Sequence, residues 1–517
     1  MHDEFELKLA LTPEQLDKLA RHPLLRSLRR ERKAPAHLVS TYFDTPAGQL
    51  RERAMALRVR RDGETRTQTL KVKGNGASGL QHFREYEAQI NGNEPDLGLI
   101  DDPDLKSMFE TNGLAAEITP VFTTEFDRRR YLLHLADSEI ELALDRGEIH
   151  TGTKSMPICE AELELVSGRP SRIYELALVL QDSIAFRLES RTKARRGYDL
   201  ALNREPEPVR ATDPNLAPSM SVAEAFAAIA RTCSEQIRSN EGAVLAGVDP
   251  EGVHQMRVGI RRLRAAVQTF REHLAPEAYA FLKEELSWMQ TELGPARDWD
   301  VFLVETLPSV EKRLDEERTF EALRVAAERA RRMAYERAHG FLADPRYARL
   351  LLRLNLGLEE GSLFAHVAGA PIGPMTRSVG DFAAEVLSGR DKKLRKRGRN
   401  HARLSTDQLH KVRIEAKKVR YGVEFFRRLY PAKTVKPYVK SVAAIQDALG
   451  SLNDAAVTRH LLEELRLTSA SFESYSKPLT ERAVGIVLGW QAARLEDGLR
   501  AFHDVWDTYA KADRFWT

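Results

Sequence analysis

The chain has 517 residues, which is too long for one ordinary hydrophobic core and predicts two or three domains. Hydrophobic residues make up 42% and charged residues 30%, as in water-soluble globular proteins, and no apolar run approaches the roughly 20 residues of a membrane-spanning helix. The net charge is +3, there is no signal-peptide pattern, and only Cys159 and Cys233 are present, so a disulfide framework is excluded and we expect a cytoplasmic location.

The N-terminal stretch Glu4-Phe5-Glu6-Leu7-Lys8 has the alternation of a β-strand. Because successive side chains of a strand point to opposite faces, Glu4, Glu6 and Lys8 share one face, and the apolar residues share the other. The following Thr12-Pro13-Glu14-Gln15 has an N-capping Thr and a Pro at the first helical position, which predicts a helix. The chain thus begins with a strand that has a charged face.

The same alternation returns along the chain up to residue 165. Asp62-Gly63 separates two of these strands and is a typical hairpin turn, because Gly tolerates the positive φ that a tight turn requires. We expect about eight strands, nearly all with one charged and one apolar face. They include segments 37–43, 56–60, 68–73, 85–87, 124–130, 139–144 and 159–165.

Two arrangements fit this pattern. In the simpler one, the strands form an antiparallel sheet with its polar face in solvent. However, one strand is acidic and others are basic, and Glu160, Glu162 and Glu164 would repel one another unless cations lay between them. The second arrangement is a closed barrel with charged faces lining its lumen and apolar faces covered by helices, predicted at residues 13–22, 104–112 and 172–183.

Such a lumen would suit a metal and a phosphorylated substrate. Clustered carboxylates favour a hard divalent cation such as Mg²⁺ or Mn²⁺. Converging arginines and lysines favour a ligand with several phosphates. Phosphoryl transfer depends largely on positioning and charge neutralisation, so this combination of side chains predicts that chemistry.

The first 200 residues or so resemble the CYTH domain of the triphosphate tunnel metalloenzymes. The resemblance rests on Glu4-x-Glu6-x-Lys8, Leu57-Arg58-Val59-Arg60, Leu70-Lys71-Val72, residues 158–165 and residues 192–198. It implies an eight-stranded antiparallel tunnel that binds a triphosphate with divalent metals. It further implies metal ligands at Glu4, Glu6, Asp145, Glu160 and Glu162, substrate ligands at Lys8, Arg58, Arg60, Lys71, Lys73, Arg128 and Lys193, and catalytic roles for Glu4, Glu6, Lys8 and Glu85.

The chain departs from the family pattern at a few positions. Lys73 and Glu87 stand where members of the family vary, and Thr192-Lys193 replaces the usual Ser-Lys while keeping the ammonium group. The resemblance implies metal-dependent hydrolysis of inorganic triphosphate to diphosphate and phosphate. Nucleoside or thiamine triphosphate is the alternative substrate, and a non-catalytic polyphosphate granule protein is the alternative function.

A proline-rich stretch separates the two halves, with Pro206, Pro208, Pro214 and Pro218 and no periodic apolar pattern. We predict a tunnel domain at residues 1–202, a linker at 203–220 and an all-α domain of two duplicated helical bundles at 221–517. The duplication is visible as His254-x-x-Arg257-x-x-x-Arg261-x-x-Arg264, which returns 156 residues later (410 − 254) as His410-x-x-Arg413-x-x-x-Lys417-x-x-Arg420. Leu293-Gly294 returns as Leu449-Gly450 at the same offset, and Arg271 as Arg427.

At 100° per residue, each of these motifs forms one basic stripe on a helix, which we extend from His254 to Arg271 in the first copy. A solvated surface is the simple explanation, but two copies headed by His favour a shared polyanionic ligand. No interleaved aromatic residues or nucleic-acid-binding motif is evident, so nucleic acid is an unlikely partner.

This half resembles the CHAD domain over roughly residues 221–510. The resemblance implies binding of inorganic polyphosphate, and with it association with polyphosphate granules. The implied ligands are His254, Arg257, Arg261, Arg264, His410, Arg413, Lys417 and Arg420. We expect no catalysis here, because neither histidine has an acid and a nucleophile at evident spacing.

Overall fold

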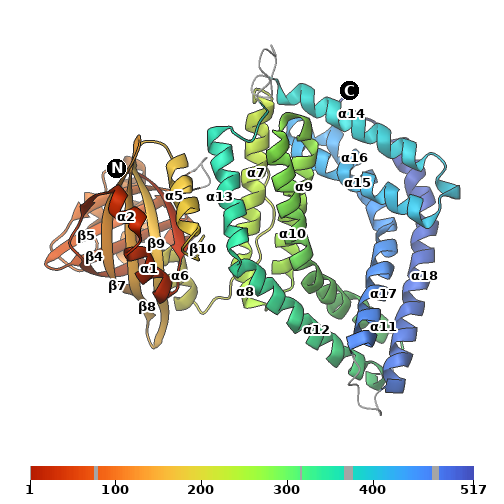
Figure 1. Cartoon of the computed structure of the whole chain (residues 1–517), viewed down its shortest axis with the longest axis horizontal. Coiled ribbons are helices and arrows are strands. Elements are labelled where there is room, and N and C mark those ends of the chain that lie inside the picture. Colours follow the sequence, from red (N-terminus) through yellow and green to blue (C-terminus); the bar gives the residue numbers. More distant parts are fainter. Residues whose placement is uncertain (1, 75–79, 315–316, 366–376, 469–476) are drawn as a thin grey trace. The chain divides into compact units, whose positions relative to one another are not determined.

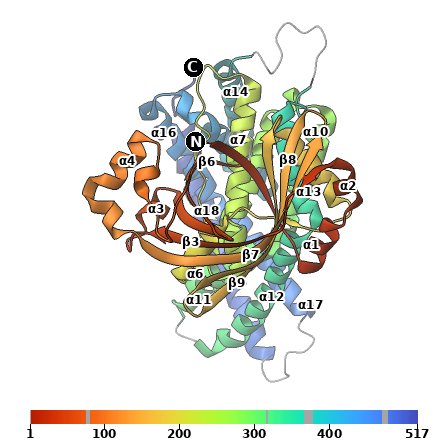
Figure 2. The same ribbon diagram turned by 90° about the vertical axis from the view of Figure 1, so that its left-hand side faces the viewer.

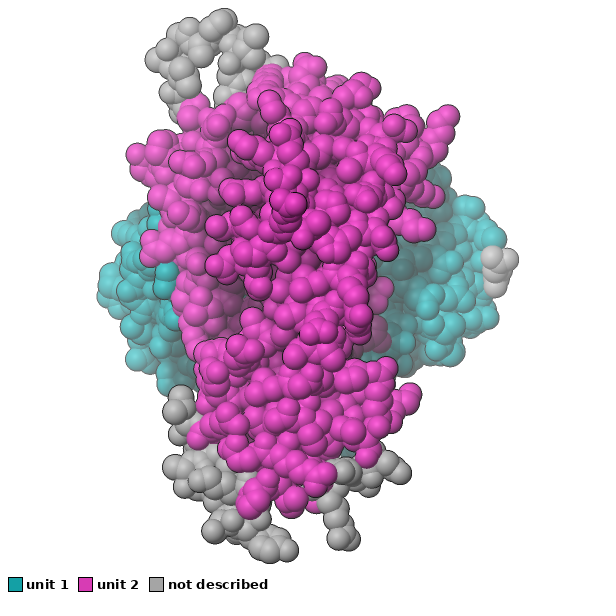
Figure 3. Space-filling view, turned by 90° about the vertical axis from the view of Figure 1, so that its right-hand side faces the viewer, with its two compact units in different colours: residues 1–206, 342–360 teal, residues 207–341, 361–517 magenta. Residues whose placement is uncertain are grey.

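The computed structural model of the chain describes residues 2–74, 80–314, 317–365, 377–468 and 477–517. It divides into two compact units, coloured separately in Figure 3. The tunnel unit comprises residues 1–206 with 342–360, and the helical unit comprises residues 207–341 with 361–517.

The tunnel unit is built on one antiparallel sheet that closes on itself (Figures 1 and 2). Eight strands pair in the order β1-β6-β5-β4-β3-β7-β8-β9, and β9 pairs back with β1. Strands β2 and β10 pair with β7 and β1 beside this ring. The strands are β1 (His2–Ala10), β2 (Arg29–Arg32), β3 (Ala36–Asp44), β4 (Met55–Asp62), β5 (Thr65–Lys73), β6 (Gln81–Gln89), β7 (Thr119–Leu135), β8 (Ser138–Thr151), β9 (Lys154–Ser167) and β10 (Arg187–Leu188).

Strand β1 shows which way the charged faces of the ring point. Its Glu4, Glu6 and Lys8 are only 5%, 3% and 4% exposed, whereas a solvent-facing sheet would leave them in water. Lys71 of β5 forms an ion pair with Glu4 although β6 lies between their strands, so the pair crosses the interior. The charged faces therefore line the inside, and the predicted eight-stranded antiparallel tunnel is confirmed.

Helices cover the apolar outer faces of the strands. Leu57 and Leu70 of the sheet pack in one cluster with Leu105 and Phe109 of α4, and α1 and α5 pack against β9. The three predicted covering helices are present, within a few residues of their expected bounds. The helices of this part are α1 (Pro13–Ala20), α2 (Pro23–Leu28), α3 (Gln49–Glu52), η1 (Leu97–Leu99), α4 (Pro103–Glu110), η2 (Thr111–Glu117), α5 (Ser171–Gln181) and α6 (Lys193–Ala201).

One helix of the tunnel unit comes from the second half of the sequence. Helix α13 (Pro345–Glu360) packs against α5. The amide of Gln181 donates to the carbonyl oxygen of Pro345 at 2.8 Å, and Arg349 lies 2.8 Å from a carboxylate oxygen of Asp182. The strands and α13 are thus joined in space although about 140 residues separate α6 from α13 in the sequence.

The helical unit contains the two copies of the basic motif, on α9 and α15, which contact each other (Figure 1). Helix α9 also packs against α7 and α10, and α15 against α14 and α16. None of the described helices has an apolar stretch long enough to span a bilayer. The elements are α7 (Val222–Ser239), α8 (Glu241–Ala246), α9 (Glu251–Thr269), η3 (Arg271–His273), α10 (Pro276–Val301), η4 (Phe302–Thr306), α11 (Leu307–Glu311), α12 (Glu317–Ala343), α14 (Val379–Gly398), η5 (His401–Arg403), α15 (Thr406–Phe426), η6 (Arg427–Leu429), α16 (Ala432–Ala448), α17 (Gly450–Thr468) and α18 (Lys477–Ala510).

The basic stripes are shorter than the sequence predicts. Helix α9 ends at Thr269 and α15 at Phe426, so Arg271 and Arg427 lie in the turns that follow. Phe270, the residue after α9, is fully buried among aromatic rings, and this packing ends the regular helix before Arg271. The extension of the stripe to Arg271 was therefore wrong, whereas the positions from His254 to Arg264 share one helix.

Gly147 in β8 lies where β7 comes closest. A Cβ at this position would be 2.1 Å from the main-chain oxygen of Glu125 and 2.4 Å from the Cα of Phe126. We expect Gly147→Ala to destabilise the tunnel unit by about 3 kcal/mol, because β7 must move to admit the methyl group. Faster amide hydrogen exchange in peptides from β7 and β8 would report this loss.

Gly92→Ala is the control for this substitution. Its Cβ would meet only the main-chain nitrogen of Glu94, at 3.9 Å. We expect it to leave the exchange of β7 and β8 unchanged, and equal protection in both variants would contradict the steric explanation.

Candidate functional site

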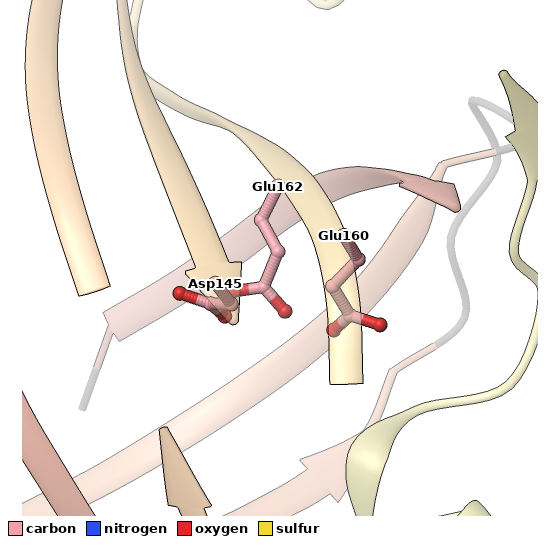
Figure 4. A group of neighbouring side chains, drawn as sticks. All are labelled: Asp145, Glu160 and Glu162. Atoms are coloured by element: carbon pink, nitrogen blue, oxygen red, sulfur yellow. The ribbon is translucent and has the colours of Figure 1, made fainter. Parts of the chain in front are cut away.

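The first part of the site is a group of three carboxylates on neighbouring strands (Figure 4). Asp145 of β8 lies opposite Glu160 of β9 in the sheet, and Glu162 follows two residues later on the same face. One oxygen from each lies within 4.8 Å of the other two. Asp145 and Glu160 are 0% and 1% exposed, so three acids share a buried space.

Cations from three elements neutralise these acids. Lys193, at the first position of α6, lies 2.6 Å from Asp145 and 2.9 Å from Glu162, and it also contacts Glu160. Arg128 of β7 donates two hydrogen bonds to Asp145, at 2.7 and 2.6 Å. Lys8 of β1 contacts Glu162 and donates to Glu6 at 2.7 Å. Although burial raises the pKa of the Asp145 carboxyl, Arg128 and Lys193 hold it below its ordinary value.

A second charged group lies around Lys71 of β5. Its ammonium is 2.5 Å from Glu4 and also contacts Glu85 of β6, which lies opposite Lys71 in the sheet. Burial lowers the pKa of Lys71, but Glu4 and Glu85 more than offset this effect and keep the ammonium charged. The structure thus brings Glu4, Lys71 and Glu85 together, as the sequence predicts for residues that line one lumen.

Arg60 of β4 has too few anions around it, and Arg58 on the same strand has an unused donor. Burial, followed by the nearby charges of Arg58 and Arg128, lowers the pKa of Arg60 to about 9. Arg60 donates only to the hydroxyl of Ser40, at 3.3 Å, and the buried Nε of Arg58 has no hydrogen-bond partner within the described part of the chain. A phosphate group would supply both the missing charge and the missing acceptors.

Glu164 of β9 has too few cations around it, and Glu6 of β1 also has a raised pKa although it pairs with Lys8. Burial, followed by the charge of Glu4, raises the pKa of Glu164 to about 8, and burial also raises the pKa of Glu6. A divalent cation would relieve this repulsion, and the donors available are all carboxylate oxygens, which suit Mg²⁺ or Mn²⁺. The residues therefore fit the metal that the family resemblance implies.

Two charged residues of the tunnel are absent from the predicted site, and one predicted site residue is exposed. Arg196 is 6% exposed and pairs with Glu160, and its spacing of three from Lys193 on one helix could have revealed it. Glu164 continues the alternation of Glu160 and Glu162. By contrast Lys73, the last residue of β5, is exposed, so the structure does not place it among the buried charges.

The second candidate site lies in the helical unit, where the two basic stripes meet. Burial, followed by the charges of Arg413 in its own copy and Arg261 in the other copy, lowers the pKa of Lys417 to about 8. Burial lowers the pKa of Arg413, and the charge of Arg261 lowers it as well. Within the described residues, the buried Nε atoms of Arg261 and Arg413 have no hydrogen-bond partners. The two stripes therefore form one cationic site with unused donors.

Two glutamines complete this site and were not predicted. Arg264 donates to the side-chain oxygen of Gln290 at 2.5 Å, and Arg420 donates to that of Gln446 at 2.9 Å. Gln446 follows Gln290 by the same 156 residues (446 − 290) that separate the motifs. The repeat thus extends to equivalent side-chain contacts, and the constant offset was the signal that could have found them.

Comparisons with known proteins match the two halves of the chain to different families. The family model of the CYTH domain matches residues 2–198, and that of the CHAD domain matches residues 228–463. A Haemophilus influenzae protein named inorganic triphosphatase is 31% identical over 199 residues, which are 38% of this chain and 55% of that protein. The chain thus matches about half the length of that relative.

Some solved structures are similar to one or the other half of the chain. The CHAD domain from the plant Ricinus communis is 35% identical, with a TM-score of 0.50, and the match covers 60% of this chain and 98% of that one. A putative adenylyl cyclase from Hippeastrum, described as having a dominant triphosphatase activity, is 18% identical with a TM-score of 0.29, over 40% of this chain and 97% of that one. The sequence matches and the two architectures together show that this chain is a CYTH domain followed by a CHAD domain.

Proposed function

We propose that the tunnel hydrolyses inorganic triphosphate to diphosphate and phosphate with Mg²⁺ or Mn²⁺. The observation on which this rests is the two-sign lining of the tunnel. Arg60 is short of negative charge around it, Glu164 is short of positive charge, and the buried Nε of Arg58 has no acceptor in the described part of the chain. A triphosphate with its metal supplies both, and the related inorganic triphosphatase supports this choice of substrate.

In this proposal, Arg58, Arg60, Lys71, Arg128 and Lys193 bind the phosphate oxygens. Each cation that now contacts a carboxylate has further N–H donors for a phosphate, since guanidinium offers five and ammonium three. Glu4, Glu6, Asp145, Glu160 and Glu162 would hold the metal. When bound, the metal supplies charge neutralisation and a more acidic water.

Glu85 is the proposed acceptor for the proton of the attacking water. Water forms a new bond to the terminal phosphorus, the bond to the bridging oxygen breaks, and diphosphate leaves. Lys71 beside Glu85 keeps the pKa of that carboxyl lowered despite its burial, so Glu85 is ionised and can accept a proton or a hydrogen bond. Lys8 fixes Glu6 and Glu162 by pairing with both carboxylates.

The activity prediction concerns one carboxylate and one ammonium group of the tunnel. We expect Glu4→Gln and Lys193→Met to lower kcat/KM for tripolyphosphate at least a hundredfold, because each removes a charge that the substrate complex needs. Chelation of divalent cations should abolish hydrolysis, and added Mg²⁺ or Mn²⁺ should restore it. Phosphate release from tripolyphosphate is the assay.

Arg129→Met is the control, because Arg129 neighbours Arg128 on β7 but is exposed. It should keep the wild-type rate. Near-normal activity in both tunnel variants would refute the proposed site, and faster hydrolysis of ATP or thiamine triphosphate by the wild-type protein would correct the substrate.

We infer that the helical unit binds inorganic polyphosphate, which would bring the enzyme to polyphosphate granules. The inference is supported by the meeting of the two stripes and by the unpartnered Nε atoms of Arg261 and Arg413. A bare phosphate chain requires only cations along its path. Nucleic acid would in addition use stacking aromatic side chains, which the stripes do not provide.

The binding prediction combines one arginine from each copy. We expect Arg257→Ala with Arg413→Ala to weaken polyphosphate binding at least tenfold and to reduce its dependence on salt, because two charge-assisted contacts are lost. Isothermal titration with long-chain polyphosphate at two salt concentrations would measure this. Equal affinity for single-stranded DNA and polyphosphate at the same salt would contradict the assignment.

The third expectation is a pH dependence. A bound phosphate favours the ammonium form of Lys417, whose pKa in the free protein is lowered to about 8, first by burial. Affinity should therefore be full below pH 8 and fall above it, because binding must then take up a proton. Lys417→Arg should remove most of this fall, since guanidinium stays charged. Lys411→Arg, at an exposed position of the same helix, should leave the fall unchanged.

A further inference from the structure

An acidic side chain lies in the basic site of the helical unit. Glu305 belongs to η4, a π-helical turn directly after α10, and its carboxylate is 3.2 Å from the guanidinium of Arg297. Arg297 follows the repeated Leu293-Gly294 pair by three residues. Burial lowers the pKa of His254, and the charge of Arg297 is the next largest cause of this lowering. Wide turns of this kind frequently occur at functional sites.

Glu305 acts on motif residues from both copies. In the first copy, its charge opposes the lowering of the pKa of His254 that burial and Arg297 cause. In the second copy, Asp454 has its pKa raised by burial, and Glu305 contributes to the same rise. Glu305 is thus electrostatically coupled to a motif residue of each copy, in addition to its contact with Arg297.

The second copy has no counterpart of this ion pair. The offset of 156 places Asn453 (297 + 156) opposite Arg297 and Leu461 (305 + 156) opposite Glu305. Leu461 is 4% exposed and belongs to the core, and α17 is helical without interruption from Gly450 to Thr468. Asn453 accepts a hydrogen bond from Arg413 at 3.1 Å. The two copies therefore differ where Glu305 stands.

We propose that Glu305 is an internal counter-anion that occupies Arg297 until a phosphate of the ligand displaces it. The proposal rests on the polyphosphate binding proposed above. Displacement requires little rearrangement, because the side chain of Glu305 is 60% exposed and can turn into solvent. Arg297 is then available only to a ligand with enough phosphates bound elsewhere in the site, so Glu305 favours long chains over short ones.

Glu305→Gln tests this in the full-length protein. We expect it to bind long-chain polyphosphate about tenfold more tightly, because Arg297 becomes free and a repulsive charge is lost. The gain should be larger for short than for long polyphosphate chains, and the salt dependence should steepen by about one counterion. Glu385→Gln is the matched control, since Glu385 forms a similarly exposed pair with Arg377, and it should keep the wild-type affinity.

Arg297→Asn separates masking from simple repulsion. If Glu305 acts through Arg297, Glu305→Gln should give little gain in the Arg297→Asn background. A full gain there, or equal affinities for Glu305→Gln, Glu385→Gln and the wild type, would overturn the proposal. Absence of polyphosphate binding by the wild-type protein would instead refute the binding function. Tryptophan fluorescence would verify folding, because all five tryptophans lie between residues 288 and 516.

Discussion

Neutralisation of buried charge inside a closed ring of strands is the interaction on which the tunnel unit depends. Asp145, Glu160 and Glu162 could not share one largely buried space without Lys193, Arg128 and Lys8 beside them, because an unpaired buried charge costs several kcal/mol. Ion pairs such as these hold strands that are not neighbours in the sheet, and they draw the start of α6 into the tunnel. The same groups are the ones that a phosphorylated ligand and a metal would contact.

Much of this arrangement could be predicted from alternation and the sign of charge. Glu4, Glu6 and Lys8 on one face of a first strand, followed by strands with Arg58 and Lys71, fit a shared interior better than a solvated sheet, and the structure confirms the closed tunnel. Lys73 shows the limit of this reasoning. Period two continues to the end of β5, and Lys73 is still paired with Phe83 of β6, yet the side chain of this last residue is exposed. Nor does any local pattern indicate that α13 packs against α5.

In the helical unit, the duplication could be predicted from the sequence because its offset is constant. The basic stripe of each copy could be predicted as well. The proximity of Arg261 to Arg413 and Lys417 could not be predicted, since the contact between α9 and α15 depends on tertiary packing. The register of the stripe was predictable only as far as the helix extends, which aromatic packing at Phe270 decides. Glu305 was hidden for a related reason. The motif predicts what the copies share, whereas Glu305 is where they differ.

Both units contain charge that their own residues do not balance. Burial and neighbouring cations lower the pKa of Arg60 to about 9 and that of Lys417 to about 8, while burial and Glu4 raise that of Glu164 to about 8. Each of these groups is less stable in its charged form in the free protein than it would be in water. A ligand of opposite charge removes this cost on binding, so the imbalance favours recognition at the expense of the free fold. Arg128, paired twice with Asp145, has no such imbalance and serves the fold as much as the ligand.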